Sequence, residues 1–191
     1  NINTAQPWIR EAPVGDWFYA PWFTYDSGSM IRFVIESICR DGNAALNIPI
    51  KPDGSIDDNA VTMLEEVGQW MDINGEAVYG SKAWTTLGEG EIVNGKLKKL
   101  PGGALGNTHK DFKFYPHDIR FTVGENGCLY AFCLGLPQSG QEVNIKSLAQ
   151  GKYNVKKVSV LGSNEEIKWE QRGDGLRVNA PKNIPCRTSP P

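Results

Sequence analysis

Apolar residues recur at helical spacing in two stretches of the first eighty residues. Residues 27–40 repeat them three and four apart, with Ser29 placed to cap the first turn and Gly42 just beyond the end. A second helix is predicted after Asp57, which can act as its cap, with Asp58 in the first turn, where the helix dipole favours negative charge. The apolar positions of the two helices are Met30, Ile31, Val34, Ile35 and Ile38, then Val61, Leu64, Val67 and Met71.

Two strands are predicted beside these helices. Residues 16–23 form an aromatic run stopped by Pro21, consistent with a strand that ends in an aromatic-lined loop. Residues 1–15 carry two prolines and no period, and we expect them to be loop. Residues 43–50 are nearly all apolar rather than alternating, which is typical of a strand covered on both faces.

Strand, helix, strand and helix in this order predict a parallel βαβα unit. Two parallel strands cannot bury themselves, because their apolar faces and open edges need further parallel strands beside them. The residues downstream follow a different pattern, so we expect the neighbouring strands to precede residue 1. This part of the chain is therefore predicted to be the last turns of a barrel or an open sheet.

From about Trp84 the pattern changes to short strands separated by turns. Apolar residues alternate at Ile119, Phe121 and Val123, and the sequences GENG (124–127) and RGDG (172–175) predict tight turns. Six or seven such strands predict an antiparallel β-sandwich of about 100 residues. The strand-like segments are 112–123, 128–136, 142–148, 154–162, 165–171 and 176–181.

Composition excludes several kinds of partner and cofactor. The formal charge is −2, from 20 Lys and Arg against 22 Asp and Glu, with no long run of one sign, so we expect no nucleic-acid partner. The sequence contains no stretch of about 20 apolar residues, so no membrane-spanning helix is predicted. The four cysteines form no CxxC pair and only two histidines accompany them, so we expect no metal and no other cofactor. We interpret the cysteines as free and mostly buried: Cys39, Cys128, Cys133 and Cys186.

Residues with reactive side chains are mostly explained by local structure. Acid/base hydrolysis needs two carboxyl groups facing one bond, and four pairs of carboxylates close in sequence are candidates for this role. The turn, the helix cap and the helix surface account for them better than catalysis. His109 and His117 are interpreted as surface or strand-end residues, and Gly102-Gly103 as a flexible loop. The carboxylate pairs are Asp53 with Asp57, Asp57 with Asp58, Glu65 with Glu66, and Glu165 with Glu166.

An aromatic cluster within residues 16–23 is the feature least typical of a core. Sugars present apolar C–H faces that stack on aromatic rings, and the loops after barrel strands build active sites. The cluster therefore indicates a sugar site, or else rings that only fill the barrel mouth. Its members are Trp17, Phe18, Tyr19, Trp22 and Phe23.

Long stretches of the chain resemble the C-terminal part of α-L-fucosidases of glycoside hydrolase family 29. They include PWIREAPVGDWFY (7–19) and residues 38–84, in which DGSID is followed by NGEAVYGSKAW. Further stretches between 117 and 178 match as well. The resemblance implies a fold in which residues 1–83 are the last two β/α units of a (β/α)8-like barrel. Residues 84–191 would then be an all-β antiparallel sandwich.

The resemblance also implies a function. Such enzymes remove terminal α-L-fucose with retention, from fucosylated oligosaccharides or glycoconjugates, through a glycosyl intermediate on an aspartate. Their nucleophile and acid/base lie on earlier strands, so this chain alone is expected to be inactive and to pack against the preceding barrel portion or a second copy. Trp17 is the expected wall of the fucose pocket, and Tyr19 a second contact. The resemblance places such a protein outside the cell, in the periplasm or in the lysosome.

Two other interpretations remain open at the level of sequence. The β-sandwich could be a carbohydrate-binding or docking module, with Trp169 and Tyr153 as exposed aromatics, although Trp169 fits a core position equally well. Alternatively, the chain has no activity and only packs against its other half. That case predicts an apolar patch around residues 43–50.

Overall fold

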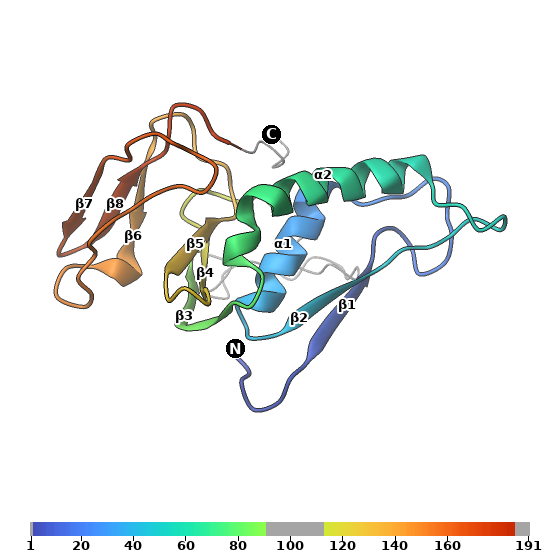
Figure 1. Cartoon of the computed structure of the whole chain (residues 1–191), viewed down its shortest axis with the longest axis horizontal. Coiled ribbons are helices and arrows are strands. Elements are labelled where there is room, and N and C mark those ends of the chain that lie inside the picture. Colours follow the sequence, from blue (N-terminus) through green and yellow to red (C-terminus); the bar gives the residue numbers. More distant parts are fainter. Residues whose placement is uncertain (1, 91–112, 186–191) are drawn as a thin grey trace.

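The computed structural model of the chain describes residues 2–90 and 113–185 (Figure 1). An α/β part, residues 2–81, lies at one end of the elongated molecule, and six strands lie at the other. The features predicted at Gly102-Gly103, His109 and Cys186 lie outside the described residues.

The α/β part contains the predicted parallel unit, with its first strand in a different place. Strand β1 (Ile9–Pro13) pairs in parallel with β2 (Asn43–Asn47), in a register from Ile9 opposite Asn43 to Pro13 opposite Asn47. The prediction of a strand at 16–23 and of loop up to residue 15 is therefore wrong. The strand was missed because it is short and contains Arg10 and Glu11, and its buried residues, Ala12 and Pro13, stand at its end.

Helix α1 (Ser27–Ile38) follows the first loop and is capped by Asp26 instead of the predicted Ser29. The Asp26 carboxylate accepts the backbone N–H of Ser29 at 2.8 Å and its hydroxyl at 2.6 Å, and its negative charge is favourable at the start of the helix. The helix ends before Arg40, and Asp41 takes the left-handed conformation expected near Gly42.

Helix α2 (Asp58–Asn74) begins as predicted, with Asp57 accepting the backbone N–H of Asn59 at 3.1 Å. Helix α1 lies between β2 and α2 (Figure 1), and Met30 and Phe33 of α1 share a core with Ala60 and Met63 of α2. In residues 43–50, Ala44, Leu46 and Ile48 are only half buried against this core, and Ile50 is exposed. The expectation of a strand covered on both faces is thus not met within the described residues.

The second part has the predicted antiparallel sandwich. Strands β3 (Lys82–Glu89), β4 (Ile119–Val123) and β5 (Leu129–Cys133) form one sheet. Strands β6 (Glu142–Ile145), β8 (Gly175–Asn179) and β7 (Trp169–Arg172) form the other, in that order. The two sheets share one core, and the predicted turns at 124–127 and 172–175 join β4 to β5 and β7 to β8. The core residues are Ile119, Phe121, Val143, Ile145, Leu148 and Leu176.

One predicted strand of the sandwich is absent from the described structure. Residues 154–162 pair with no strand there, although Val155 and Val158 still pack against the core. The backbone N–H of Val155 donates to Oε1 of Gln171 at 3.3 Å. The Gln171 side chain thus accepts the hydrogen bond that a neighbouring strand would otherwise accept. The apolar residues of this segment alternate because they are partly buried in turn, although the segment pairs with no strand among the described residues.

The two parts are joined through α1. Ile31, Ile35 and Ile38 of α1 form a core with Phe132 and Leu134 at the end of the first sheet. Two residues of the neighbouring strand β4, Arg120 and Thr122, make polar contacts with the α/β part. Nε of the fully buried Arg120 donates to Oε1 of Glu36 at 2.6 Å, and Oγ1 of Thr122 donates to the carbonyl of Ala77 at 2.9 Å. The first sheet therefore packs on α1, and Val67 and Trp70 of α2 pack against the same cluster.

Candidate functional site

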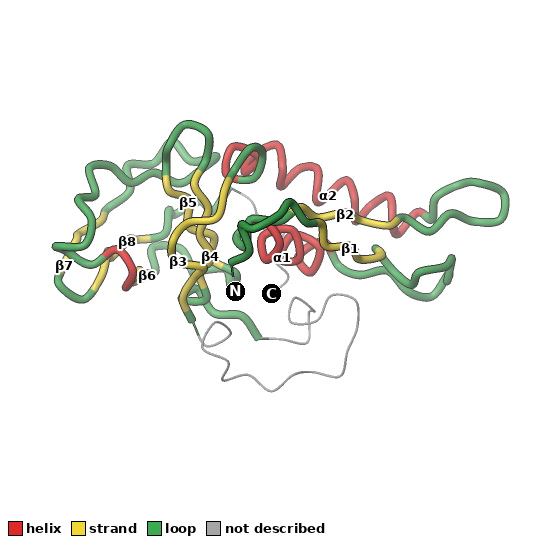
Figure 2. Tube along the Cα trace, turned by 90° about the horizontal axis from the view of Figure 1, so that it is seen from below, coloured by secondary structure: helices red, strands yellow, loops and turns green. Residues whose placement is uncertain are grey.

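The candidate site lies at the carboxyl ends of the two parallel strands. The loop after β1, residues 14–26, and the loop after β2, residues 48–57, extend from the same end of the molecule (Figure 2). Ligands of parallel α/β folds bind at this end of the strands, since the loops there can vary without disturbing the sheet. Both sequence-predicted site residues, Trp17 and Tyr19, lie on the 14–26 loop.

Trp17 and Tyr19 are both bonded to the second strand or its loop. The carbonyl of Trp17 accepts a hydrogen bond from Nδ2 of Asn47 at 3.3 Å, and the hydroxyl of Tyr19 donates to Oδ2 of Asp57 at 3.3 Å. The Trp17 side chain is 49% exposed, so one face of its indole is available to a ligand. Asp57 also caps α2 and lies 4.0 Å from Nζ of Lys51, so its carboxylate has structural partners on both oxygens.

The 14–26 loop is fixed by its own contacts. The backbone N–H of Tyr25 donates to the carbonyl of Val14 at 2.8 Å, and the rings of Phe23 and Tyr25 meet edge to face at 4.6 Å. A Cβ on Gly15 would lie 2.5 Å from the carbonyl oxygen of Phe23, so only glycine permits this approach. Burial, followed by the charge of Asp16, raises the pKa of Tyr25, which therefore stays a neutral phenol. The loop presents its exposed rings from a rigid base.

Three polar residues of α2 belong to this end of the molecule: Asn59 and Thr62, which the sequence did not single out, and Glu66, which was assigned from the sequence to the helix surface. Asn59, Thr62 and Glu66 line a groove whose other wall is the 21–27 segment, including Trp22. Oε2 of Glu66 accepts a hydrogen bond from the Ser27 hydroxyl at 2.6 Å. The spacing of three and then four residues places them on one helix face, a signal that was available in the sequence. It was read as ordinary helix surface.

Two of the other carboxylates, those of Asp53 and Glu165, act as structural acceptors, as predicted. Asp53 accepts the backbone N–H of Ser55 at 2.9 Å, and this hydrogen bond, with that from the Ser55 hydroxyl, lowers the pKa of Asp53. Oε1 of Glu165 accepts from the backbone of Asn183 and Oε2 from that of Lys182, and these two bonds lower its pKa. Such groups hold turns together and are not poised as catalytic acids.

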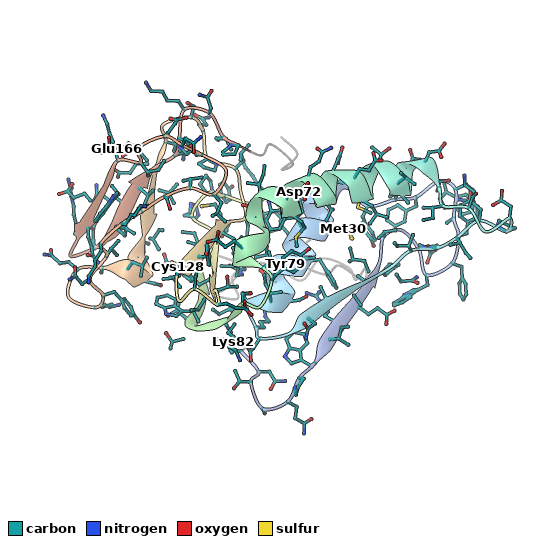
Figure 3. All side chains as sticks on the ribbon, in the orientation of Figure 1. Met30, Asp72, Tyr79, Lys82, Cys128 and Glu166 are labelled. Carbon is teal, nitrogen blue, oxygen red and sulfur yellow. The ribbon has the colours of Figure 1, made fainter. Side chains whose placement is uncertain are left out.

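The thiols and the described histidine carry no catalytic arrangement. His117 is exposed and stacks on Tyr115, with ring centroids 5.2 Å apart. Burial raises the pKa of Cys39 to about 12 and that of Cys133 to about 11, so both remain protonated thiols. Cys128 is exposed at the hairpin (Figure 3), so the prediction of free cysteines holds for these three, and that of burial fails for Cys128.

Across residues 2–90 and 113–185, no three His, Cys, Asp or Glu side chains are grouped to hold a metal ion. No helix within these residues has the length and apolarity to span a bilayer.

The two aromatic residues that would serve a carbohydrate-binding sandwich differ from each other in exposure. Trp169 is half buried against the sandwich core, whereas Tyr153 is exposed beside Trp84.

Comparison with known proteins finds one family over both parts of the chain. A family model described as alpha-L-fucosidase matches residues 1–76, and one described as alpha-L-fucosidase C-terminal domain matches residues 113–190. The tissue alpha-L-fucosidase of Rattus norvegicus is 28% identical over 166 residues, covering 86% of this chain and 30% of the relative. The alpha-L-fucosidase of Dictyostelium discoideum is 35% identical over 160 residues, covering 82% and 29%.

Solved structures give the same result for the fold. The Thermotoga maritima alpha-fucosidase in complex with fucose has a TM-score of 0.66 at 22% identity, covering 93% of this chain and 37% of that one. Alpha-L-fucosidase isoenzyme 1 from Paenibacillus thiaminolyticus has a TM-score of 0.65 at 23% identity, covering 95% and 38%. The chain spans about a third or less of the length of the curated relatives it matches.

Proposed function

The chain belongs to the α-L-fucosidase family, glycoside hydrolase family 29, and we propose from this that it forms the C-terminal part of an exo-acting, retaining α-L-fucosidase. The enzyme would hydrolyse terminal α-L-fucose from fucosylated oligosaccharides or glycoconjugates. The observation that carries the proposal is the pairing of β1 with β2. It brings the loops that follow two parallel strands, and with them Trp17 and Tyr19, to one end of the fold.

We assign residues 1–83 to the last two β/α units of a (β/α)8-like barrel and residues 84–191 to a C-terminal β-sandwich. The order β1, α1, β2, α2 followed by six antiparallel strands supports this division. Strand β3 begins at Lys82, close to the proposed boundary. A complete barrel of this kind has about 250 residues, so most of it would come from a segment outside these 191 residues.

The two catalytic carboxyl groups would lie on that other segment. A retaining glycosidase places a nucleophile and an acid/base about 5 Å apart on either side of the scissile bond. Asp53, Asp57 and Glu165 instead accept hydrogen bonds that hold turns and a helix cap. Glu36 is buried against Arg120. These carboxylates are already engaged in the fold, which supports a non-catalytic role for each of them.

Trp17 and Tyr19 would form part of the wall of the fucose pocket. The half-exposed indole of Trp17 offers an apolar face to the C–H groups and the methyl group of fucose. The Tyr19 hydroxyl, oriented by Asp57, would contact the sugar beside it. Because neither residue moves a proton in this scheme, their contribution is to binding and orientation.

The proposal is tested by assaying hydrolysis of 4-nitrophenyl α-L-fucoside by the 191-residue chain and by a form extended on its N-terminal side to a full barrel. We expect release of 4-nitrophenol by the extended form only, with a mock purification as the control for contaminating enzyme. In the extended form, Trp17→Ala should raise KM by about tenfold, the loss of one buried aromatic contact. Activity in the 191-residue chain would show that a catalytic pair has been overlooked.

A further inference from the structure

A groove beside the aromatic loop has the composition of a second ligand site. It runs between the 21–27 segment and the first half of α2, and Trp22 at its rim is 84% exposed. An indole left in water at this extent is uncommon for a residue that normally contributes to cores. The opposite wall presents an amide, a hydroxyl and a carboxylate, from Asn59, Thr62 and Glu66.

The groove is preorganised. The Ser27 hydroxyl donates to Oε2 of Glu66 at 2.6 Å, which ties one wall to the other and sets the direction of the carboxylate. The backbone N–H of Phe23 donates to the carbonyl of Ala20 at 3.3 Å, closing a turn around Trp22. Since these groups are already in place, a ligand would lose little free energy in ordering them.

We propose that this groove binds a pyranose unit of a glycan, a unit other than the fucose that is removed. The apolar C–H face of the sugar stacks on Trp22, and its hydroxyl groups bond to Asn59, Thr62 and Glu66. This arrangement of one aromatic surface and a few directed polar groups is what a small polar ligand requires.

Other ligand classes fit the lining less well. A nucleotide would also stack on Trp22, but its phosphate would meet the carboxylates of Asp26 and Glu66, and the lining contains no lysine or arginine. An amphipathic peptide helix needs a continuous apolar surface, whereas the second wall offers only Met63 between polar residues. A neutral ring with several hydroxyl groups suits both walls, because its C–H face can stack on Trp22 and its hydroxyls can bond to the polar residues of α2.

The inference rests on the proposed function in one respect, which is that the sugar belongs to the same glycan as the fucose. Trp17 and Trp22 are five residues apart in one loop, so their Cα atoms lie within about 17 Å of each other. A single oligosaccharide could therefore reach both residues. Trp17 would contact the terminal fucose and Trp22 a unit further along the chain of sugars.

The test is a titration of the ¹⁵N-labelled 191-residue chain, followed by NMR at the indole N–H resonances of its 6 tryptophans. The resonance that disappears in Trp22→Ala is assigned to Trp22. Lactose and N-acetyllactosamine are then added, with L-fucose in parallel. We expect saturable movement of the Trp22 resonance with a disaccharide, and an affinity about five- to tenfold weaker in Glu66→Gln. Because Trp22→Ala has lost that resonance, its affinity is followed at the backbone amide resonances that move in the parent chain, and we expect the same weakening there.

Tyr79→Ala is the matched control. Tyr79 is an aromatic residue, 69% exposed, on the loop beyond the end of α2 (Figure 3), and its removal should leave the affinity unchanged. The inference is wrong if the Trp22 resonance stays still with both disaccharides. It is also wrong if Tyr79→Ala weakens binding as much as Trp22→Ala does.

A second measurement separates this inference from the proposed function. In the extended form, Trp22→Ala should raise KM for fucosylated lactose and leave KM for 4-nitrophenyl α-L-fucoside unchanged, because the aryl fucoside has no further sugar that could reach the groove. If Trp22→Ala has the same KM as the parent for each of the two substrates, the proposed binding in the groove is wrong. An extended form that hydrolyses neither substrate would overturn the proposed function and leave the NMR result standing.

Discussion

Replacing Glu36 by glutamine should lower the free energy of unfolding more than the removal of any exposed charge. Nε of Arg120 lies 2.6 Å from Oε1 of Glu36, and the Arg120 side chain is fully buried. The other oxygen of Glu36 contacts Arg40, so one carboxylate serves two guanidinium groups. The Glu36→Gln change removes the negative charge but keeps the volume and one acceptor oxygen. It therefore removes the charge together with one of the two acceptors, since the amide nitrogen would face one of the guanidinium groups.

The size of the effect follows from the geometry. At 2.6 Å the attraction of two unit charges is about 6 kcal/mol for an effective dielectric constant near 20. Arg120 retains two neutral acceptors, the carbonyl oxygens of Ile119 at 2.8 Å and Glu89 at 3.3 Å, while its Nη2 has no acceptor among the described residues. A loss of about 3 kcal/mol of unfolding free energy is thus expected, at the lower end of the range for broken buried pairs.

Urea unfolding of the 191-residue chain, followed by tryptophan fluorescence, measures this loss. For a denaturant slope of about 2–3 kcal/mol per molar, the midpoint should fall by about 1 M or more. Glu170→Gln is the control, because Glu170 and Arg172 are also 2.6 Å apart but on the surface, where the pair is screened by water. Its midpoint should not change.

The double variant Glu36→Leu with Arg120→Met distinguishes charge from packing. Removing both charges leaves no fully buried ion unpaired, because Arg40 is partly exposed and keeps its hydrogen bond to the backbone carbonyl of residue 36. The midpoint should therefore return close to that of the parent. The reasoning is refuted if Glu36→Gln lowers the midpoint no more than Glu170→Gln does. It is refuted equally if the double variant is less stable than Glu36→Gln, since the cost would then come from lost packing.

Two further predictions concern the loops and the thiols. Asp57→Ala should lower the unfolding free energy by about 1–2 kcal/mol, because the cap of α2 and the acceptor of Tyr19 are lost together, and urea unfolding measures this. At pH 8 a thiol reagent should modify Cys128, while Cys39 and Cys133, whose pKa values burial raises to about 12 and 11, should react only above about pH 10 or after unfolding, as peptide mapping by mass spectrometry would reveal.

The helices and the turns were predictable from sequence because their signals are local. Asp57 caps α2 through a backbone N–H two residues away, and the turn at 124–127 closes through a bond from the N–H of Gly127 to the carbonyl of Gly124. The cap of α1 was misplaced by three residues because Asp26 and Ser29 are both good capping residues, and the choice depends on where the preceding loop ends.

Strand β1 and the groove were not predictable in the same way. Arg10 and Glu11 give β1 a polar sequence, and its pairing with β2 depends on residues 34 positions downstream, from Ile9 to Asn43. The groove needs Trp22 of a loop to lie across from Thr62 and Glu66 of a helix, an arrangement that no local pattern specifies. In both cases the deciding contact is tertiary, which overrides what the segment would indicate alone.

Helix α1 connects the candidate site with the sandwich. One side of the helix, with Met30 and Phe33, packs with α2 and β1, while Ile35 and Ile38 pack against Phe132 of the first sheet. Its first residue follows Asp26, the last residue of the 14–26 loop, so a shift of α1 would displace the loop that carries the aromatic residues. The sandwich is distant from the strand ends, yet it fixes the element from which that loop departs. Its contribution to the site is therefore positional, and it acts through the buried contacts of α1.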